Sequence, residues 1–330
     1  MNLKEDINYS IWCDFIERDF LENEFQEIIA NGTIFGATSN PAIFQQSIST
    51  SVAYEQHINM LQANDVKKIY EELAVSDIKR AGEILKPLYD KNSNDGLVSL
   101  EIDPTLCDDM MGSIEEGARL YGQVDINNIM IKVPATKAGY GVMENLTSIG
   151  INVNATLVFS PQQAIECAKA LSAGIKKSAK DTKAVISVFV SRFDRAMDKE
   201  FDVLGLDTSR LGIVNATKCY YEINKFNNTN IRTLFASTAV KGEELPQSYY
   251  VDNLIFPNSI NTAPLKTIYE WQENGKKEPS DILSEELCNE YFDKLKDNKI
   301  DIEKLYNDLL KDGLSAFKVS FQKLLKEIKL

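Results

Sequence analysis

The sequence predicts an α/β fold, and within that class a single-domain (β/α)8 TIM barrel with additional helices. Three observations lead to this prediction. Short apolar runs of strand length recur along the chain, amphipathic helical segments separate them, and the alternation repeats about eight times in 330 residues. Such a barrel typically needs about 250 residues, so this chain has room for extra elements. An open doubly wound sheet is the alternative, but no G-x-G-x-x-G follows a strand and there is no Walker A motif.

Eight apolar runs are the expected strands. Most of them are apolar on both faces, which is typical of parallel strands covered by helices and not of an antiparallel sheet with one wet face. The runs are Ile11–Ile16, Thr33–Thr38, Leu97–Ile102, Ile129–Val133, Val153–Phe159, Ala184–Val190, Arg232–Ser237 and Asn253–Phe256.

Amphipathic helical segments lie between the expected strands. The apolar residues of Phe20–Ile29 share one helix face, and Asn31-Gly32 supplies a stop signal. Ser160-Pro161 combines a capping residue with a proline in the first turn and therefore predicts the start of a helix. Asp108–Leu120 is a third helical segment.

Two helical segments exceed a minimal barrel. Ser51–Asn94 predicts a long helical insertion, and Ser284–Leu330 predicts two or three further helices, including the amphipathic Phe317–Ile328. The chain has no linker rich in Pro, Gly or Ser, no repeat and no low-complexity tract, so residues 1–330 are expected to form one domain. The C-terminal helices either cover the barrel mouth as a lid or cover only its side, and the sequence leaves both arrangements open.

The charge balance argues against several classes of partner. Lys plus Arg number 36 and Asp plus Glu number 49, so the formal net charge of -13 repels nucleic acid and anionic membrane surfaces. No apolar stretch approaches the length of a membrane span. The first residues lack an apolar region behind a basic start, so we expect no secretory signal and a cytoplasmic protein. A monomer and a homodimer both remain open.

Cysteine and histidine content limits the possible chemistry. The five cysteines are widely spaced, without C-x-x-C or metal-ligand spacing, so reduced thiols and no metal site are expected. The single histidine, His57, lies on a predicted polar helix face and is expected at the surface. Acid–base chemistry would therefore use carboxylates, lysine or tyrosine.

Lys132 is the most informative residue of the sequence. It lies in Asn128–Thr136, an apolar, β-branched run flanked by turn residues, which predicts a buried strand. A lysine inside such a strand costs free energy unless its charge is removed or paired. A neutral buried amine is a nucleophile suited to a Schiff base with a carbonyl substrate. The alternative is a structural lysine that pairs with a buried carboxylate or extends to the surface.

Polar residues near the carboxyl ends of the other expected strands are predicted to point into one mouth, where active sites of these barrels lie. An internal hydrogen-bond network that fixes barrel layers is the alternative, and it would account for Asn152 and Asp103. It accounts poorly for Asp14, Glu101 and Lys132, because two carboxylates and an amine form a titratable cluster. The polar residues are Asp14, Asn40, Glu101, Asp103, Asn152, Asn154, Thr156, Ser187, Ser191, Arg192 and Ser237, with Lys241 in the following loop.

Several segments resemble those of transaldolases. They are Ile11–Asp14, Gly36–Phe44, Val98–Asp103, Ile129–Thr136, Asn152–Ser160, Ser187–Arg192 and Phe235–Thr238. Matching segments recur in the family's order from about residue 11 to about residue 265, and the tail from Ser284 is similar only in helical character. The resemblance implies transfer of a dihydroxyacetone unit from sedoheptulose 7-phosphate to glyceraldehyde 3-phosphate, giving erythrose 4-phosphate and fructose 6-phosphate. This is a step of the non-oxidative pentose phosphate pathway, and the family uses no metal or organic cofactor.

The resemblance also implies roles for individual residues. Lys132 corresponds to the Schiff-base lysine, and Asp14 to the carboxylate that moves a proton at the sugar hydroxyl during carbon–carbon cleavage. Glu101 and Thr156 correspond to the pair that positions a catalytic water. The substrate-binding positions are Asn40 and Asn154 for the dihydroxyacetone hydroxyls, Ser187 and Phe189 for the sugar channel, and Arg192 and Ser237 for the phosphate.

The expected phosphate site departs from the family pattern. Many transaldolases carry a second arginine two residues after the Ser237 position, where this chain has Ala239. Lys241 is the expected substitute, although lysine binds phosphate as a point charge where arginine can bind it bidentately.

Two other functions stay open on the sequence. A fructose-6-phosphate aldolase that releases free dihydroxyacetone would share the lysine and the barrel. Glu101 together with Asp14 favours transfer, because the resemblance implies that aldolase-type relatives alter these acid–base and water-positioning residues. A non-catalytic barrel used as a binding module is the second alternative, because a fold alone does not determine function.

Overall fold

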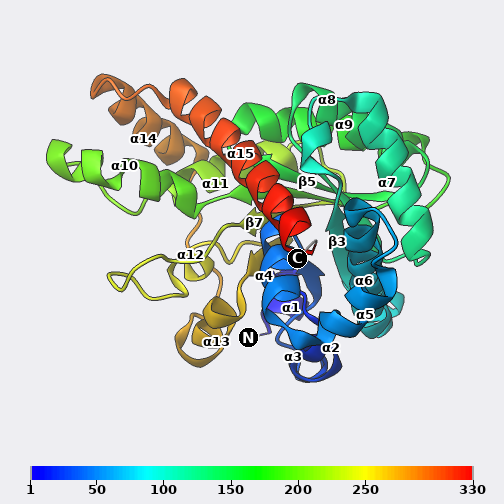
Figure 1. Cartoon of the computed structure of the whole chain (residues 1–330). Helices are drawn as coiled ribbons and strands as arrows, with labels where there is room; N and C mark the ends of the chain where they lie inside the picture. Colours follow the sequence, from blue (N-terminus) through cyan, green and yellow to red (C-terminus); the bar gives the residue numbers. More distant parts are fainter. Residues whose placement is uncertain (1, 329–330) are drawn as a thin grey trace.

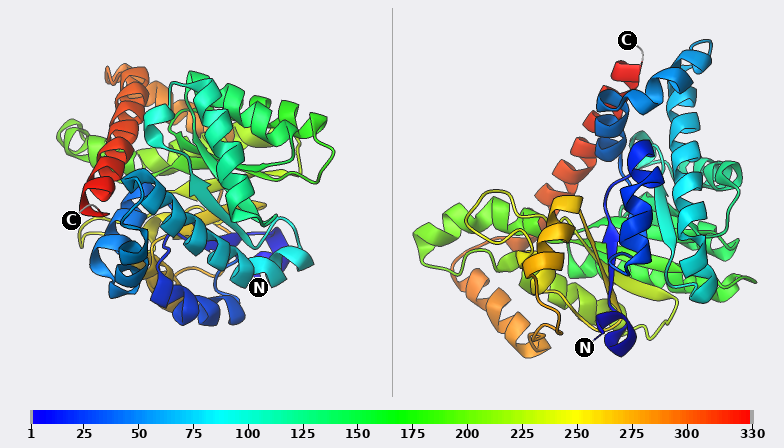
Figure 2. Two further views of the ribbon diagram at one scale, coloured as in Figure 1. Left: turned by 45° about the vertical axis from the view of Figure 1, so that its right-hand side comes forward. Right: turned by 90° about the horizontal axis from the view of Figure 1, so that it is seen from below.

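The computed structural model describes residues 2–328 and confirms the predicted barrel (Figures 1 and 2). Eight parallel strands close in sequence order, with β8 paired to β1. The strands are β1 (Ser10–Cys13), β2 (Gly36–Thr38), β3 (Leu97–Glu101), β4 (Ile129–Pro134), β5 (Asn152–Val158), β6 (Ala184–Phe189), β7 (Ile231–Ala236) and β8 (Ser259–Ala263).

The predicted eighth strand was wrong. Asn253–Phe256 is an irregular segment that follows the short helix α12, and β8 is the more polar Ser259–Ala263. The polar residues of β8 are buried against other parts of the barrel. Thr262 lines the mouth, and Asn261 Oδ1 accepts a hydrogen bond of 2.8 Å from the Thr238 hydroxyl. A search for apolar runs therefore selected the neighbouring buried segment in place of the strand.

Helices surround the strands, and none in residues 2–328 is both long and apolar enough to cross a membrane. The segment 51–94 contains the 3-10 helix η1 (Val52–Tyr54) and two α-helices, and a second 3-10 helix is η2 (Pro104–Leu106). The α-helices are α1 (Leu3–Ile7), α2 (Arg18–Glu22), α3 (Glu24–Ala30), α4 (Pro41–Thr50), α5 (Glu55–Leu61), α6 (Val66–Lys91), α7 (Met110–Val124), α8 (Lys137–Ser148), α9 (Pro161–Lys177), α10 (Ser191–Leu204), α11 (Leu211–Asn224), α12 (Tyr249–Asp252), α13 (Leu265–Asn274), α14 (Glu285–Asp297) and α15 (Ile302–Ile328).

Capping chemistry sets the helix ends. Ser160 and Gln163 form a reciprocal capping box at the start of α9, as the Ser-Pro pair predicted. The expected helix Phe20–Ile29 is instead divided into α2 and α3 at Asn23, whose φ and ψ are -124° and -96°. The Asn23 side chain donates a 2.7 Å hydrogen bond to the Asp19 carbonyl, which competes with helix continuation.

The barrel interior is a packed core at its N-terminal end and a polar mouth at its C-terminal end. Trp12, Met130 and Leu234 belong to one buried apolar cluster inside the strands. Gly36 makes room for the largest of them, because a Cβ at this position would lie 2.5 Å from the Trp12 ring. This packing leaves the mouth as the accessible part of the interior.

Helix α15 crosses the mouth of the barrel. Figure 1 shows it running diagonally across the front of the strands, and it packs against α4, the C-terminal end of β5 and η2. Gly313 allows the close approach, because a Cβ there would lie 2.9 Å from Leu157 Cδ2 and 3.3 Å from Arg192 Nη1. Phe317, one turn further along, lines the mouth. The C-terminal helix therefore forms a wall of the mouth and is more than a cover for the barrel side.

Candidate active site

A cavity of about 200 Å3 lies at the C-terminal end of the strands. It brings together residues from seven of the eight strands or the segments that directly follow them, together with α4, α10 and α15. Most of the predicted site residues are on its wall. The lining consists of Asp14, Thr38, Asn40, Ala42, Lys132, Thr156, Ser187, Phe189, Arg192, Ala236, Ser237, Thr262 and Phe317.

Lys132 points into the barrel because the alternating pattern of β4 turns its apolar neighbours toward the helices. Strand register places it directly between Glu101 of β3 and Asn154 of β5. Its side chain is 7% exposed, and Nζ donates one hydrogen bond of 2.9 Å to the Ser39 carbonyl. The contact with Glu101 Oε2 is 3.7 Å, longer than a hydrogen bond. The amine is therefore buried but not locked to an acid, and it faces the cavity.

Two carboxyl groups flank this amine. Burial raises the pKa of Glu101 to about 7, the positive charge of Lys132 opposes that rise, and the negative charge of Asp14 adds to it. Burial also raises the pKa of Asp14, against the effects of Lys132 and of a 2.6 Å hydrogen bond from the Thr38 hydroxyl. With a pKa of about 7, Glu101 can exchange a proton close to neutral pH, which suits general acid–base chemistry.

Glu101 and Thr156 each present a polar atom without a partner. Among residues 2–328, neither Glu101 Oε2 nor Thr156 Oγ1 has a hydrogen-bond partner, and both atoms are buried. Thr156 is opposite Pro134 in the register of β5 and β4, two residues beyond the Lys132–Asn154 pair. Buried polar atoms are rarely left unsatisfied in proteins, so these two oxygens are suited to bind water or a substrate group.

The two asparagines differ in their position. Asn40 lines the cavity and caps α4, with Oδ1 accepting from two backbone N–H groups of the first turn. Its amide nitrogen stays available for a ligand hydroxyl. Asn154 is fully buried and does not belong to the lining. Its Oδ1 accepts a 2.6 Å hydrogen bond from the Ser187 hydroxyl, which does line the cavity.

The opposite side of the cavity is cationic. The Arg192 guanidinium lies 5.1 Å from the Phe189 ring centroid, a cation–π distance. Ser237 has a left-handed φ of 56°, an uncommon conformation for serine that is often found at functional sites. Its hydroxyl is 3.2 Å from that of Ser191. Lys241 is exposed in the loop after Ser237 and is not part of the lining.

Comparison of the sequence with known proteins identifies its family. The sequence profile described as Transaldolase/Fructose-6-phosphate aldolase matches residues 11–328. A protein named Transaldolase from Helicobacter pylori (strain P12) is 47% identical over 320 residues, which cover 96% of this chain and 98% of that protein. The chain belongs to the transaldolase/fructose-6-phosphate aldolase family. A further Transaldolase, from Campylobacter jejuni subsp. jejuni serotype O:23/36 (strain 81-176), is 44% identical over 335 residues, 97% of this chain and 99% of that protein.

Several residues of the cavity lining were not assigned a role from the sequence, among them Thr38, Thr262 and Phe317. Thr38 and Thr262 share a 2.7 Å contact between hydroxyls and together hold Asp14. Phe317 covers the amine from α15, with its ring centroid 5.8 Å from Lys132 Nζ. Thr262 lies in the strand that the apolar pattern missed. No local signal identifies Phe317, because only folding brings the C-terminal helix over the mouth.

The prediction that Asn152 points into the mouth was wrong. Asn152 begins β5 at the opposite end of the barrel. Its amide nitrogen donates to the carbonyls of Asn127 and Ile129 at 3.0 Å each, and its oxygen accepts from the Lys183 N–H at 2.8 Å. It is a structural residue that ties two loops to the strand.

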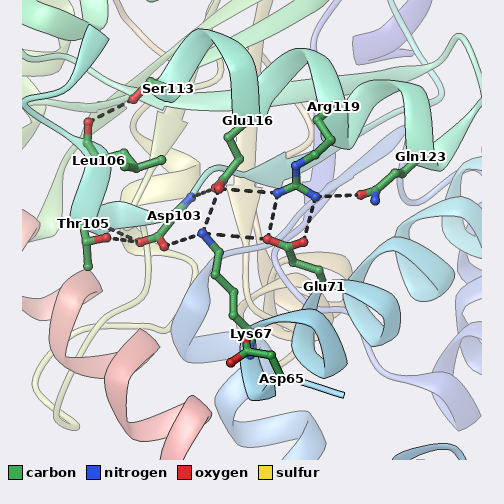
Figure 3. A network of polar contacts seen from close by, with 10 residues as sticks. All are labelled: Asp65, Lys67, Glu71, Asp103, Thr105, Leu106, Ser113, Glu116, Arg119 and Gln123. Atoms are coloured by element: carbon green, nitrogen blue, oxygen red, sulfur yellow. Dashed lines mark hydrogen bonds and ion pairs between the residues drawn. The ribbon is translucent and has the colours of Figure 1, made fainter. Parts of the chain in front are cut away.

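Asp103 was also wrongly placed in the mouth. The chain leaves β3 after Glu101, and Asp103 caps η2 and faces the outer helices. Figure 3 shows it in a network in which Lys67 Nζ contacts Asp103 at 2.7 Å and Glu116 at 2.8 Å. Glu116 also accepts the Asp103 N–H at 2.6 Å, and Arg119 pairs with Glu71. Every charge in this outer network has a partner.

His57 and the five cysteines are not part of the cavity lining. His57 is half-buried, and its Nδ1 is 2.9 Å from Arg18 Nη2. Burial and the Arg18 charge lower the His57 pKa. All five cysteines are buried without a disulfide partner. In the part of the chain that the structure describes, no group of three or more His, Cys, Asp or Glu residues is arranged to hold a metal ion.

Proposed function

We propose that this protein is a transaldolase that carries dihydroxyacetone as a Schiff base on Lys132, in the non-oxidative pentose phosphate pathway. The observation that carries the proposal is the buried Lys132 amine on the wall of an open cavity, between two carboxyls with raised pKa values. Full-length relatives named Transaldolase support the same activity. Sedoheptulose 7-phosphate is the proposed donor and glyceraldehyde 3-phosphate the proposed acceptor.

The first step forms the covalent intermediate. The Lys132 amine adds to the ketone carbon of the donor, and the resulting carbinolamine loses water to give an iminium ion. This step needs a proton on the departing oxygen and removal of a proton from nitrogen. Glu101 and Thr156 are the proposed holders of the water that relays these protons, because each has a buried oxygen without a protein partner in residues 2–328.

The second step breaks the sugar chain. The cationic iminium withdraws electrons from the adjacent carbon–carbon bond, and Asp14 accepts the proton of the hydroxyl on the leaving carbon. The bond electrons become the enamine, and erythrose 4-phosphate leaves as an aldehyde. The enamine then attacks glyceraldehyde 3-phosphate while Asp14 returns its proton, and hydrolysis of the iminium releases fructose 6-phosphate. Thr38 and Thr262 keep the Asp14 carboxylate oriented.

Substrate binding follows the two sides of the cavity. Asn40 and Asn154 are the proposed contacts of the dihydroxyacetone hydroxyls, beside the amine. Phe317 covers this region and limits the access of water to the enamine, which favours transfer over hydrolysis. The sugar channel and phosphate end comprise Ser187, Phe189, Arg192 and Ser237, with Lys241 in the loop above.

A pair of assays separates this function from its closest alternative. The purified protein is given fructose 6-phosphate with and without erythrose 4-phosphate, and both sedoheptulose 7-phosphate and free dihydroxyacetone are measured. We expect rapid transfer with the acceptor and only slow release of dihydroxyacetone without it. Release as fast as transfer would establish the aldolase-type reaction, and the absence of both products would favour a binding module.

The proposal also covers the localisation and the oligomeric state of the enzyme. Free sugar phosphates and reduced cysteines fit a cytoplasmic enzyme. The protein is proposed to be a monomer or a homodimer. Size-exclusion chromatography with light scattering decides between these two states.

A further inference from the structure

A separate cavity lies at the foot of the barrel, where the strands begin, and it shares no lining residue with the mouth. Its volume is about 420 Å3, which is within the range of small-molecule sites. Tyr9 directly precedes β1, Phe35 directly precedes β2, and Trp271 comes from α13. Together with Leu3 and Ile11 these aromatic side chains form an apolar wall. Such a wall suits a ligand with a flat apolar body.

Two residues of this wall carry a buried polar atom without a partner. Tyr9 is 2% exposed and Trp271 is 9% exposed. Within residues 2–328, neither the Tyr9 hydroxyl nor the Trp271 Nε1–H has a hydrogen-bond partner. Burial and the negative charge of Asp252 raise the pKa of Tyr9, so its hydroxyl keeps the proton and can donate it. An indole N–H can only donate, so both groups are suited to an acceptor that a ligand in the cavity supplies.

The charges on the wall favour an anionic ligand. Among the residues that the structure describes, the lining includes Lys4 and Lys277 and no carboxylate, although the chain has a net charge of -13. Asp95 neutralises Lys4 through an ion pair of 2.6 Å. Lys277 is exposed, and its Nζ donates to the Trp271 carbonyl and lies 3.6 Å from the Trp271 ring centroid. Lys277 is therefore the cation that a ligand can use.

Asp252 is the acid that acts on Lys277, and other groups hold its carboxylate. Burial lowers the pKa of Lys277, and the charge of Asp252 opposes that fall. The Asp252 carboxylate accepts hydrogen bonds of 2.7 Å from the Lys276 N–H and from the Ser248 hydroxyl. Within residues 2–328 it forms no ion pair with Lys277 at 4.0 Å or less. The Lys277 ammonium thus remains able to pair with a ligand anion.

We propose that the cavity at the foot of the barrel binds a small carboxylate with a flat apolar body. The apolar body lies against the aromatic wall. The carboxylate supplies the acceptors that the Tyr9 hydroxyl and the Trp271 Nε1–H lack, and it supplies the opposite charge for Lys277. The inference is independent of the proposed function, because it uses no residue of the mouth.

The test uses phenylacetate as the probe, with phenylacetamide as the uncharged analogue and phenethylamine as the cationic one. Tryptophan fluorescence reports on the cavity, because the chain has two tryptophans and the other, Trp12, is buried inside the strands. We expect saturable binding of phenylacetate with a Kd of about 1 mM, which is ordinary for so small a ligand. Phenylacetamide should bind about tenfold more weakly, and phenethylamine should not bind. Phenylacetate should also raise the unfolding temperature, because it binds the folded state.

Two variants locate the site. Tyr9→Phe should raise the Kd for phenylacetate about fivefold without lowering the stability of the free protein, because the hydroxyl has no partner to lose. Lys277→Gln should raise the Kd for phenylacetate about tenfold and leave that for phenylacetamide unchanged. Lys276→Gln is the matched control, since Lys276 is the exposed neighbour, carries the same charge and does not line the cavity. Its Kd should equal that of the unmodified protein.

Four results would overturn the inference. The first is the absence of saturable binding by phenylacetate, which leaves the cavity to water. The second is phenethylamine binding as tightly as phenylacetate. The third is an unchanged Kd for phenylacetate in both Tyr9→Phe and Lys277→Gln, which places the probe elsewhere. The fourth is an equal rise in Lys276→Gln and Lys277→Gln, which indicates a general effect of charge.

Discussion

Lys132 and Arg232 are two cations buried inside the same barrel, at opposite ends and in opposite circumstances. Arg232 is 2% exposed, and its guanidinium donates to the Asn8 carbonyl at 2.6 Å and the Ser259 carbonyl at 2.8 Å. Asp95 lies 3.6 Å away, yet burial lowers the Arg232 pKa to about 10. Lys132 has one hydrogen bond, to Ser39, and faces an open cavity.

A structural cation and a reactive cation differ in their hydrogen bonds and in their access to a ligand. Both residues stand in buried strands, so their position in the sequence does not distinguish them. A guanidinium cannot lose its proton under ordinary conditions and is no nucleophile, and its donors are used to join loops at the base of the barrel. An amine with free access and few committed hydrogen bonds can attack a carbonyl. The role of a buried cation therefore depends on how many of its hydrogen-bond donors are used by the protein and on whether a ligand can reach it.

Lys132→Met gives the largest expected effect on activity. Transfer should fall by about 10³-fold or more, because the nucleophile is lost. The free energy of unfolding should stay the same or rise, because an apolar chain of similar length replaces a buried amine. Transfer assays and urea denaturation measure the two quantities. If the variant did not fold, Lys132 would be a structural residue like Arg232, and the proposed difference between the two cations would be wrong.

Arg232→Met is the reciprocal experiment. We expect the free energy of unfolding to fall by about 3–5 kcal/mol, because the carbonyls of Asn8 and Ser259 and the Asp95 carboxylate lose a buried partner. The activity of the molecules that stay folded should match that of the unmodified protein. Chemical denaturation and assays at low temperature provide the readouts. An active-site defect with unchanged stability would contradict the structural role.

Glu101→Gln tests the role of the Glu101 carboxylate in proton transfer at the mouth of the barrel. The water relay should lose its carboxylate, so transfer is expected to drop about 10²-fold while the fold is retained. Steady-state kinetics measure the loss, and circular dichroism checks the fold. An active Glu101→Gln variant would remove this residue from the proposed proton relay.

The same variant tests the raised pKa of Glu101. Its folded pKa is about 7, above that of an unfolded glutamate, about 4.3. Between these values the folded state binds more protons, so the free energy of unfolding contributed by this group falls as pH rises through that window. The fall should be smaller in Glu101→Gln. Asp194, whose pKa is also raised to about 7, is present in both proteins and cancels in the difference. Equal pH profiles would contradict the shift.

The outer network in Figure 3 should give the smallest effect. Lys67→Met removes a cation that is 34% exposed and contacts Asp103 and Glu116. We expect a loss of about 1 kcal/mol in the free energy of unfolding and less than a tenfold change in activity. Lys304→Met, which breaks the exposed pair with Asp308, is the control and should leave the unfolding midpoint unchanged. A loss of activity of tenfold or more in Lys67→Met, with a loss of only about 1 kcal/mol in the free energy of unfolding, would show that the network positions Glu101.

The barrel and most of its mouth were predictable because strand periodicity dictates which side chains point inward. Lys132, Asp14 and Thr156 stand near strand ends in the sequence and line one cavity in the structure. The sequence pattern did not identify β8 because this strand carries buried polar residues, and a search for apolar runs does not detect them. The pattern also selected the buried segment Asn253–Phe256, which is apolar without being a strand.

Other parts of the site depend on where the chain leaves a strand. Asp103 is two residues beyond Glu101 and would share its face in a longer strand, but the turn into η2 directs it outward. Asn152 stands at the first residue of β5, and only the register shows that this is the far end of the barrel. Phe317 comes from a helix, so its position at the mouth follows from packing rather than from strand periodicity.

Reductive trapping shows directly whether the donor sugar forms a covalent intermediate with Lys132. The protein is incubated with fructose 6-phosphate, reduced with borohydride, digested and mapped by mass spectrometry, with Lys132→Met as the control. We expect one reduced three-carbon adduct, on the peptide that contains Lys132, and none in the control. Transfer activity accompanied by an adduct on another lysine, or by no adduct, would contradict it.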